Sequence, residues 1–305
     1  MKDLSRDLFS DKKFFSDNRN QELKELLQEF RKLKPTDEDF YSIENVTTTI
    51  FSKKIFRDFY EEERYKRMEN QILRFIHQKL RGRKTDPENE DILVDFLDHC
   101  FKKPLTENNN QNLIITFNYD LLLEYILKKH RSTLELETYY GVKLRRYSRP
   151  TEPETRYRLE ILKLHGSFNW FVAKGSSDRN ITSIYQVDPE DRDYFIHEND
   201  VPVFIPMSHG KEFYLTGTLY NTLWVKASYY LEKAEEIYFI GYGFPASDIN
   251  NLLFFGKHKN KIRKVVVHYK NDVDANLVRL KELLGKERVL SSDAKIFLSE
   301  NLDIF

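Results

Sequence analysis

The chain has 305 residues, of which 40% are hydrophobic, so it is long enough for one large domain or two modest ones with a sizeable core. Its 49 Lys and Arg residues equal its 49 Asp and Glu residues in number, so no overall charge attracts nucleic acid or a membrane surface. The one cysteine, Cys100, excludes an internal disulfide and any zinc module built from four cysteines.

The sequence predicts a cytoplasmic protein. The N-terminal stretch MKDLSRDLFSDKKFF lacks the apolar core of a signal peptide. No part of the chain approaches the roughly 18 consecutive apolar residues of a membrane span. A single cysteine also fits a reducing compartment, so we expect neither export nor membrane insertion.

Residues 1–110 are predicted to form a mainly helical region that packs on the rest of the chain. In NQELKELLQEFRKL, apolar residues recur at three- and four-residue spacing, as on one face of an amphipathic helix, and Pro35 ends the pattern. Two further segments have helical periodicity, FRDFYEEERYKRMENQILRFIHQKL and EDILVDFLDHCF, and the second of them ends ahead of Pro104.

Residues 111–305 contain short apolar runs that end in polar residues or glycine. NLIITFNYD precedes LLLEYILKKH, EEIYFIGYGFP precedes SDINNLLFF, and KVVVHYKND precedes DANLVRLKELLG, while LEILKLHG and VPVFIP are further strand candidates. Such alternation is typical of a parallel sheet covered by helices. The sequence therefore predicts an α/β fold with a Rossmann-like, mostly parallel sheet flanked by helices, and with ligands bound at the carboxyl ends of the strands.

The stretch ITFNYD places two polar side chains where the first of these strands should end. Asn118 and Asp120 could cap the helix expected to begin at Leu121, because their side chains accept hydrogen bonds from free backbone N–H groups. They could instead project into a binding site, where an amide orients a hydroxyl or water and a carboxylate faces a developing cation. Both interpretations remain open, since one residue can cap while the other binds.

The stretch LHGSFNW sets His165 in an apolar, aromatic run. A lone histidine on an apolar strand is commonly a core residue bonded to a backbone carbonyl. Gly166 and Ser167 favour a site instead, because glycine allows a ligand to approach the backbone closely and serine offers a donor. Histidine titrates near neutral pH, so His165 could then act as a general base.

The stretch FIGYGFPASD carries two glycines after a predicted strand. Backbone N–H groups around Gly241 and Gly243 could bind a phosphate together with the start of the next helix. An ordinary strand-to-helix loop, with Ser247 or Asp248 as the helix cap, explains the same residues. The two-glycine signal alone does not decide between these interpretations.

Taken in order, TFNYD, KLHGSFNW and IYFIGYGFPASDINNLLFF resemble the sirtuin-like NAD-binding family, in the branch found among prokaryotic defence proteins. The resemblance covers about residues 112 to 275. It implies that Asn118 holds the nicotinamide-side ribose and the attacking water, that Asp120 lies near the nicotinamide, and that His165 is the base. Further contacts with NAD are implied for Thr116, Phe117, Gly166, Ser167, Gly241, Tyr242, Gly243 and Asp248.

The resemblance implies an NAD-cleaving hydrolase that releases nicotinamide, with NAD as its substrate, no metal, and a role in anti-phage defence. The zinc of sirtuin deacetylases is held by cysteines, and one cysteine cannot hold it, so NAD hydrolysis is favoured over protein deacetylation. A homo-oligomer and a defence partner protein are both compatible with this interpretation.

The chain departs from the family at its start. The family opens with a strand and a glycine-rich turn of the Gly-Ala-Gly kind that binds the pyrophosphate, whereas the first glycine here is Gly82. Two alternatives to the enzyme therefore stay open. One is a non-catalytic module that binds NAD or ADP-ribose, and the other is a protein-interaction module.

Overall fold

The computed structural model describes most of the chain, and all structural statements below concern the residues that it describes. These are residues 2–32, 42–55, 59–80, 87–102, 112–130, 140, 142, 144–146, 159–172, 181–187, 200–206, 217–242, 244, 249–267, 275–292, 297–298 and 300.

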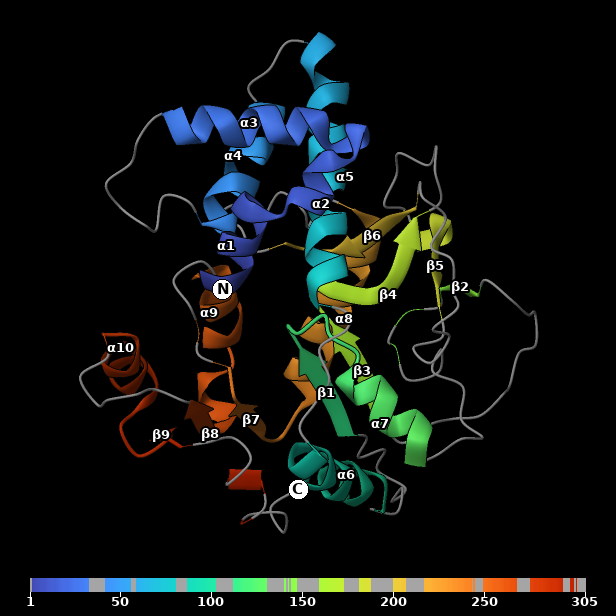
Figure 1. The fold of residues 1–305 in the computed structure, drawn as a ribbon. Coiled ribbons are helices and arrows are strands. Elements are labelled where there is room, and N and C mark those ends of the chain that lie inside the picture. The colour runs from blue at the N-terminus through green and yellow to red at the C-terminus, as the bar shows by residue number, and fades with distance from the viewer. Residues whose placement is uncertain are drawn as a thin grey trace.

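Helices and strands alternate along the second part of the chain, after a first part that is helical (Figure 1). The helices are α1 (Lys2–Ser10), α2 (Lys12–Ser16), α3 (Gln21–Lys32), α4 (Ile43–Ile55), α5 (Phe59–Leu80), α6 (Pro87–Lys102), α7 (Leu122–His130), α8 (Thr218–Lys233), α9 (Ile249–Gly256) and α10 (Ala275–Leu284). The strands are β1 (Asn112–Thr116), β2 (Arg145–Arg146), β3 (Leu159–Lys163), β4 (Gly166–Val172), β5 (Ile184–Gln186), β6 (Val201–Phe204), β7 (Ile237–Ile240), β8 (Ile262–Val267) and β9 (Val289–Ser291). Short 3-10 turns cover Asn18–Asn20, Ile181–Ser183 and Lys259–Lys261.

Five of the helices, α1 to α5, share one hydrophobic core at one end of the molecule. Leu23, Leu26 and Leu27 of α3, the residues that carry its apolar periodicity, are buried there. Phe168 of β4 and Phe204 of β6 belong to the same cluster, so this bundle packs directly on the strands. The predicted helical N-terminal region is therefore present.

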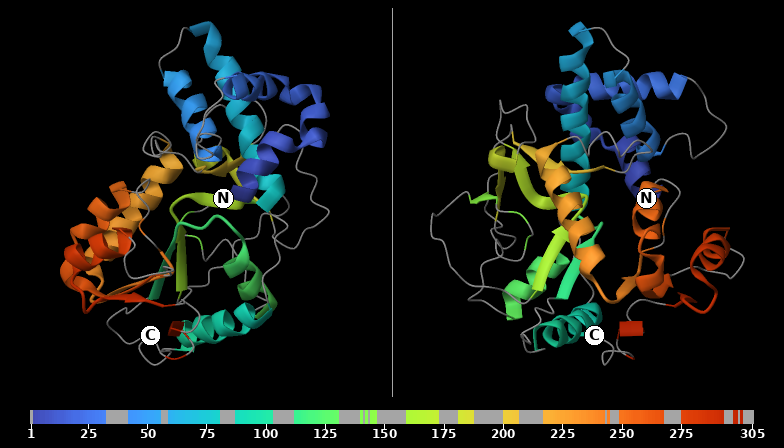
Figure 2. Two further views of the ribbon diagram at one scale, coloured as in Figure 1. Left: turned by 60° about the vertical axis from the view of Figure 1, so that its left-hand side comes forward. Right: turned by 180° about the vertical axis from the view of Figure 1, so that it is seen from behind.

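The sixth helix, α6, lies away from this bundle. It packs against α7 through a separate cluster that contains Leu97, Ile126 and Ile161. Figures 1 and 2 show α6 at the opposite end of the molecule from α3 to α5. The helical first third thus contacts the α/β part at two places, and the predicted boundary at residue 110 stays a prediction because residues 103–111 lie outside the described residues.

The parallel strands expected from the sequence are present, but they form two groups. β1 pairs with β3, and β7, β8 and β9 form a second parallel sheet in that order. Helix α7 follows β1, and α9 connects β7 to β8, as the alternating pattern predicts. The architecture is an α/β fold with parallel strands and flanking helices, which fits the Rossmann-like expectation in this general form.

A further sheet differs from the expected parallel pattern. β4 pairs antiparallel with β5 and with β6, and β2 joins the edge beside β5. β4 begins at Gly166, directly after a turn at residues 164 and 165, and the φ of Gly166, 81°, lies in the left-handed region. β4 pairs with β5 and β6 and not with the preceding strand β3, so the chain passes from one sheet to another at this point. A run of apolar residues alone does not show whether a strand pairs parallel or antiparallel.

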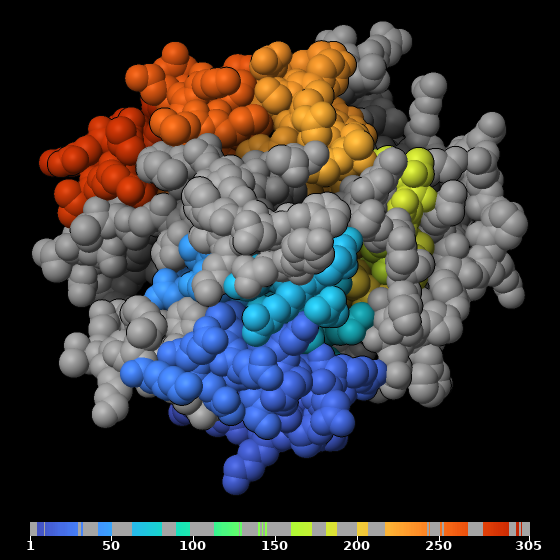
Figure 3. Space-filling view, turned by 90° about the horizontal axis from the view of Figure 1, so that it is seen from above, coloured from blue at the N-terminus to red at the C-terminus, as the bar shows by residue number. Residues whose placement is uncertain are grey.

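The N-terminal bundle and the C-terminal helices lie on different sides of the molecule. In the space-filling view of Figure 3, the blue and cyan N-terminal segments lie across from the orange and red segments of α8 to α10.

Within the described part of the chain, no helix has both the length and the apolar character needed to cross a membrane.

Candidate functional site

Pairing between β1 and β3 brings the first two motifs to the same edge of a sheet. The strands run parallel, with Thr116 opposite Lys163 at their carboxyl ends. The Leu164 backbone N–H donates to the Thr116 carbonyl at 3.0 Å, which continues the ladder past the last strand residue. TFNYD and LHG therefore leave the sheet side by side, at the edge where parallel α/β folds bind ligands.

Contacts beyond the strands keep the two motifs together. The Phe168 backbone N–H donates to the Tyr119 carbonyl at 2.9 Å. The rings of Phe117 and His165 meet edge to face, with centroids 5.0 Å apart. His165 is only 6% exposed, and its carbonyl accepts from the backbone N–H of Ile205, the residue after β6, at 2.8 Å, so this segment also fixes its position.

Asn118 and Asp120 are exposed at this edge. Asp120 Oδ1 accepts from the Leu122 backbone N–H at 3.1 Å, so Asp120 caps α7, as the capping interpretation predicts. Thr116 Oγ1 accepts from the Asn118 backbone N–H at 3.0 Å and fixes the turn between them. A carboxylate has two oxygens with several acceptor sites, so capping through Oδ1 leaves acceptor capacity on Asp120.

Packing explains Gly166 and Ser167 without a ligand. A Cβ on Gly166 would lie 2.3 Å from the Val203 carbonyl oxygen, so the close approach of β6 already requires glycine. Ser167 is fully buried, and its hydroxyl donates to Asn169 Oδ1 at 2.7 Å. The contacts with NAD predicted for these two residues are untested.

The third motif reaches the first through aromatic stacking. The Tyr242 ring stacks on the Phe117 ring with centroids 4.5 Å apart and an interplanar angle of 23°. Gly241 has a φ of 72°, and its N–H donates to the Val266 carbonyl at 2.8 Å. Gly243 and Asp248, also predicted to contact NAD, lie outside the described residues.

Two aromatic residues near this stack were not predicted from the sequence. Trp224 of α8 and Phe255 of α9 lie 6.3 Å and 6.0 Å from the Phe117 ring, centroid to centroid. With 18 Tyr and 23 Phe in the chain, aromatic composition alone could not single them out. Together with Tyr242 they surround Phe117 with ring faces and edges, beside the buried His165.

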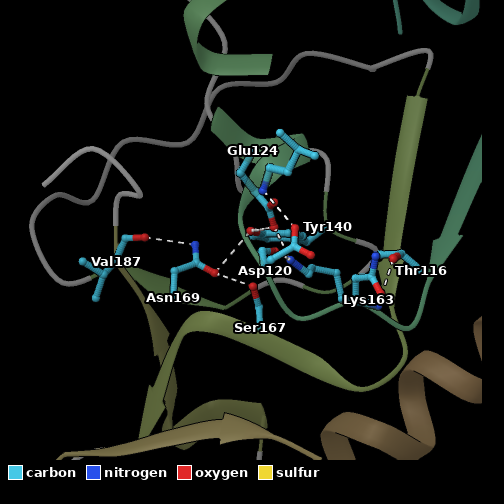
Figure 4. Close-up of polar contacts among 10 residues, drawn as sticks. Thr116, Asp120, Glu124, Tyr140, Lys163, Ser167, Asn169 and Val187 are labelled. Carbon is cyan, nitrogen blue, oxygen red and sulfur yellow. Dashed lines mark hydrogen bonds and ion pairs between the residues drawn. The ribbon is translucent and has the colours of Figure 1, made fainter. Parts of the chain in front are cut away.

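A buried polar network lies behind the strand ends (Figure 4) and was also missed. Lys163 and Glu124 are each 1% exposed, and Lys163 Nζ donates to Glu124 Oε1 at 2.7 Å. The Tyr140 hydroxyl lies 2.7 Å from the same oxygen and 3.3 Å from Asn169 Oδ1. The sequence signal was charged residues within two apolar runs, Glu160 and Lys163 in LEILKLHG and Glu124 in LLLEYIL, since buried charges normally require partners.

Burial keeps Tyr140 in its neutral form. Loss of hydration raises the pKa of the Tyr140 phenol well above its ordinary value, and the nearby Glu124 carboxylate raises it further. The phenol therefore stays a hydrogen-bond donor to Glu124 at all ordinary pH values.

No group of three or more His, Cys, Asp or Glu side chains arranged to hold a metal ion occurs in the described part of the chain.

Comparison with known families identifies the α/β part. The SIR2-like domain matches residues 112–283, which is more than half of the chain and includes all three motifs. The chain belongs to the SIR2-like family. The predicted sirtuin-like family is thereby confirmed, and membership implies an NAD-related function.

The SIR2-like match begins at β1, so α1 to α6 lie outside it. No curated protein matches the chain. The defence-associated branch and the absence of the Gly-Ala-Gly segment therefore stay predictions from the sequence.

Proposed function

We propose that this protein is an NAD glycohydrolase, which uses water to cleave the bond between nicotinamide and ribose. The observation that carries the proposal is the convergence of Asn118, Asp120 and His165 at the shared carboxyl edge of β1 and β3. These are the residue types that such a cleavage needs, and membership in the SIR2-like family supports NAD as the ligand.

The proposed roles follow from the chemistry of the bond that breaks. Departure of nicotinamide leaves a cation-like ribose, which a fixed carboxylate stabilises, and we assign this role to Asp120. The Asn118 side chain, exposed at the strand end, orients the attacking water and the ribose. His165 accepts a proton from a ribose hydroxyl as the general base.

The surroundings of these three residues suit the proposed roles. His165 is nearly enclosed and packs on Phe117, so water has little access to the ring. Asn118 and Asp120 are exposed and so can meet a ligand. The Asp120 carboxylate is held by its bond to the Leu122 N–H, which fixes its direction before a ligand arrives.

Product analysis with thermal melting tests the proposal. The purified chain is incubated with NAD, and the products are separated by liquid chromatography. We expect nicotinamide and ADP-ribose in equal amounts. A rise in melting temperature with NAD and ADP-ribose, without any nicotinamide, would instead establish a non-catalytic binding module. No rise with either ligand and no product would favour a protein-interaction module.

We further propose that the activity serves anti-phage defence in the cytoplasm, where a homo-oligomer or a partner protein controls it. This part of the proposal is supported by the sequence resemblance alone. Expression of the chain in a phage-sensitive host tests it. We expect fewer plaques with the wild-type chain than with a His165→Gln variant, and equal plaque numbers would contradict the defence role.

A further inference from the structure

Lys163 connects the interior of the protein to the backbone of the proposed site. Its ammonium group donates to the backbone carbonyl of Asp120 as well as to the Glu124 carboxylate (Figure 4). The Lys163 and Glu124 side chains are 2% and 1% exposed. A charge so deeply buried is tolerated only where its partners are fixed, so this ammonium holds one peptide group of the TFNYD turn in a defined place.

The partners of Lys163 are themselves held by a chain of hydrogen bonds. Tyr140 donates to Glu124, and Ser167 donates to Asn169 Oδ1. Asn169 Nδ2 donates to the Val187 carbonyl at 3.0 Å. The two sets of bonds meet at the Tyr140 hydroxyl, which lies 3.3 Å from Asn169 Oδ1. The network thus runs from β4, the strand that follows His165, to the turn that carries Asp120, and it joins both halves of the proposed site from behind.

A second set of the same residue types lies on the opposite face of β3. Glu160 receives hydrogen bonds from Lys226 and from the Tyr230 hydroxyl, both on α8, and the Tyr230 bond is 2.6 Å long. Residues three apart on a strand point to opposite faces, so Glu160 and Lys163 diverge. The hydrogen bonds of Glu160 join β3 to α8, and among the described residues none of these bonds reaches the TFNYD turn. The fold therefore provides a control pair of the same residue types for the Lys163 network, although the Lys226 and Glu160 side chains are more exposed, at 33% and 11%.

We propose that Lys163 is a positioning residue, which sets the place of Asp120 and Asn118 relative to His165 through its bond to the Asp120 carbonyl. The proposal rests on the proposed NAD cleavage. Lys163 is buried behind the turn and acts on the reaction through the backbone. Its loss is expected to lower kcat much more than it changes KM, because a displacement of about 1 Å in a catalytic group can cost about 100-fold in rate.

The test uses paired substitutions that remove both charges at once. Lys163→Met alone would leave the Glu124 carboxylate buried without its cation, so it is combined with Glu124→Leu. The control combines Lys226→Met with Glu160→Leu. Each protein is first checked for a cooperative melting transition, and kcat and KM for nicotinamide release are then measured. If the first pair does not fold, Lys163→Gln with Glu124→Gln replaces it, because the amides keep the buried site polar and uncharged.

We expect kcat to fall about 100-fold in the Lys163 pair and to stay within about 3-fold of wild type in the control pair, with KM changed less than about 3-fold in both. Hydrogen exchange of backbone amides in residues 117–125 should become faster only in the Lys163 pair. Equal kcat values in the two pairs would overturn the positioning role and leave the NAD-cleaving function standing. No nicotinamide release from wild type would overturn the proposed function, and this inference with it.

Discussion

Phe117 and Tyr242 stack face to face across the site, with ring centroids 4.5 Å apart. Phe117 belongs to the turn after β1, whereas Tyr242 follows β7 in a separate parallel group of strands. The stacked pair is thus a side-chain bridge between the two parallel groups. It lies beside His165, whose ring also contacts Phe117.

This pair should show measurable energetic coupling. Phe117→Leu and Tyr242→Leu are each expected to lower the free energy of unfolding, and the double variant should lose less than the sum. The coupling energy should be about 0.5 to 1.5 kcal/mol, as for other aromatic pairs beyond the area that they bury. Urea unfolding of the four proteins in a double-mutant cycle measures it, and strictly additive losses would contradict the bridge.

Substitution of His165 should separate catalysis from stability. His165→Gln is expected to lower kcat by about 100-fold to 10,000-fold, because the general base is lost, and to cost about 1 to 3 kcal/mol of stability at a buried position. His77 provides the control. His77 lies on α5 in the N-terminal bundle and is also buried. Its Nε2–H donates to the Phe168 carbonyl, with 2.8 Å between the two atoms.

His77→Gln should have a similar cost in stability but keep kcat within about 3-fold of wild type. Urea unfolding and steady-state nicotinamide release, measured on both variants, check this prediction. If His165→Gln retained full kcat, His165 would be a core residue, which is the first interpretation of LHGSFNW.

The same substitution should destabilise the protein at one glycine and have little effect at another. Gly166→Ala is expected to cost about 2 to 5 kcal/mol, because the new Cβ would meet the Val203 carbonyl oxygen at 2.3 Å and φ is 81°. At Gly256, the last residue of α9, an added Cβ would have no atom within 4 Å apart from its chain neighbours and the backbone of its own helix. Gly256→Ala should change stability by less than about 1 kcal/mol. Thermal melting of both variants is the measurement, and equal effects would contradict the close approach of β4 and β6.

The stability contributed by Tyr140 should depend on pH in the alkaline range. Because its folded pKa is raised above the ordinary value of 10.0, its contribution is fully present below pH 10 and is lost as pH rises further. Tyr140→Phe should therefore cost about 1 to 3 kcal/mol near neutral pH, through the lost bond to Glu124.

The advantage of wild type over Tyr140→Phe should shrink by about 1.4 kcal/mol per pH unit above pH 10. Urea unfolding of wild type and variant between pH 7 and 11 measures the difference. A difference that stayed constant across this range would show that Tyr140 ionises normally in the folded protein.

The local structure of this chain could be predicted from its sequence because it depends on short-range patterns. The spacing of Leu23, Leu26 and Leu27 predicts α3, and the apolar run before Asn118 predicts β1. Asp120 was expected as a helix cap, and it bonds the N–H of Leu122, the first residue of α7. These features depend only on residues close together in the chain, whose types and spacing the sequence shows directly.

Features that depend on distant partners could not be predicted in the same way. Gly166 was interpreted as allowing a ligand to approach, but the atoms that approach it belong to Val203 and Phe204 of β6. Ser167 was interpreted as a donor to a ligand, but it bonds Asn169 inside the protein. The pairing of β4 with β6 fixes the contact at Gly166, and no local pattern determines that pairing. The Ser167 bond lies within β4 itself, but only the burial of this strand decides that Ser167 faces the interior.

The most direct test of the central claim is a proton NMR time course of NAD with wild-type protein and with the His165→Gln variant at high concentration. The spectrum reports free nicotinamide and the line widths of bound NAD together. We predict that nicotinamide signals grow with wild type and stay absent with the variant, while NAD signals broaden in both. Sharp, unchanged NAD signals with the folded wild-type protein would contradict the proposal that this site binds and cleaves NAD.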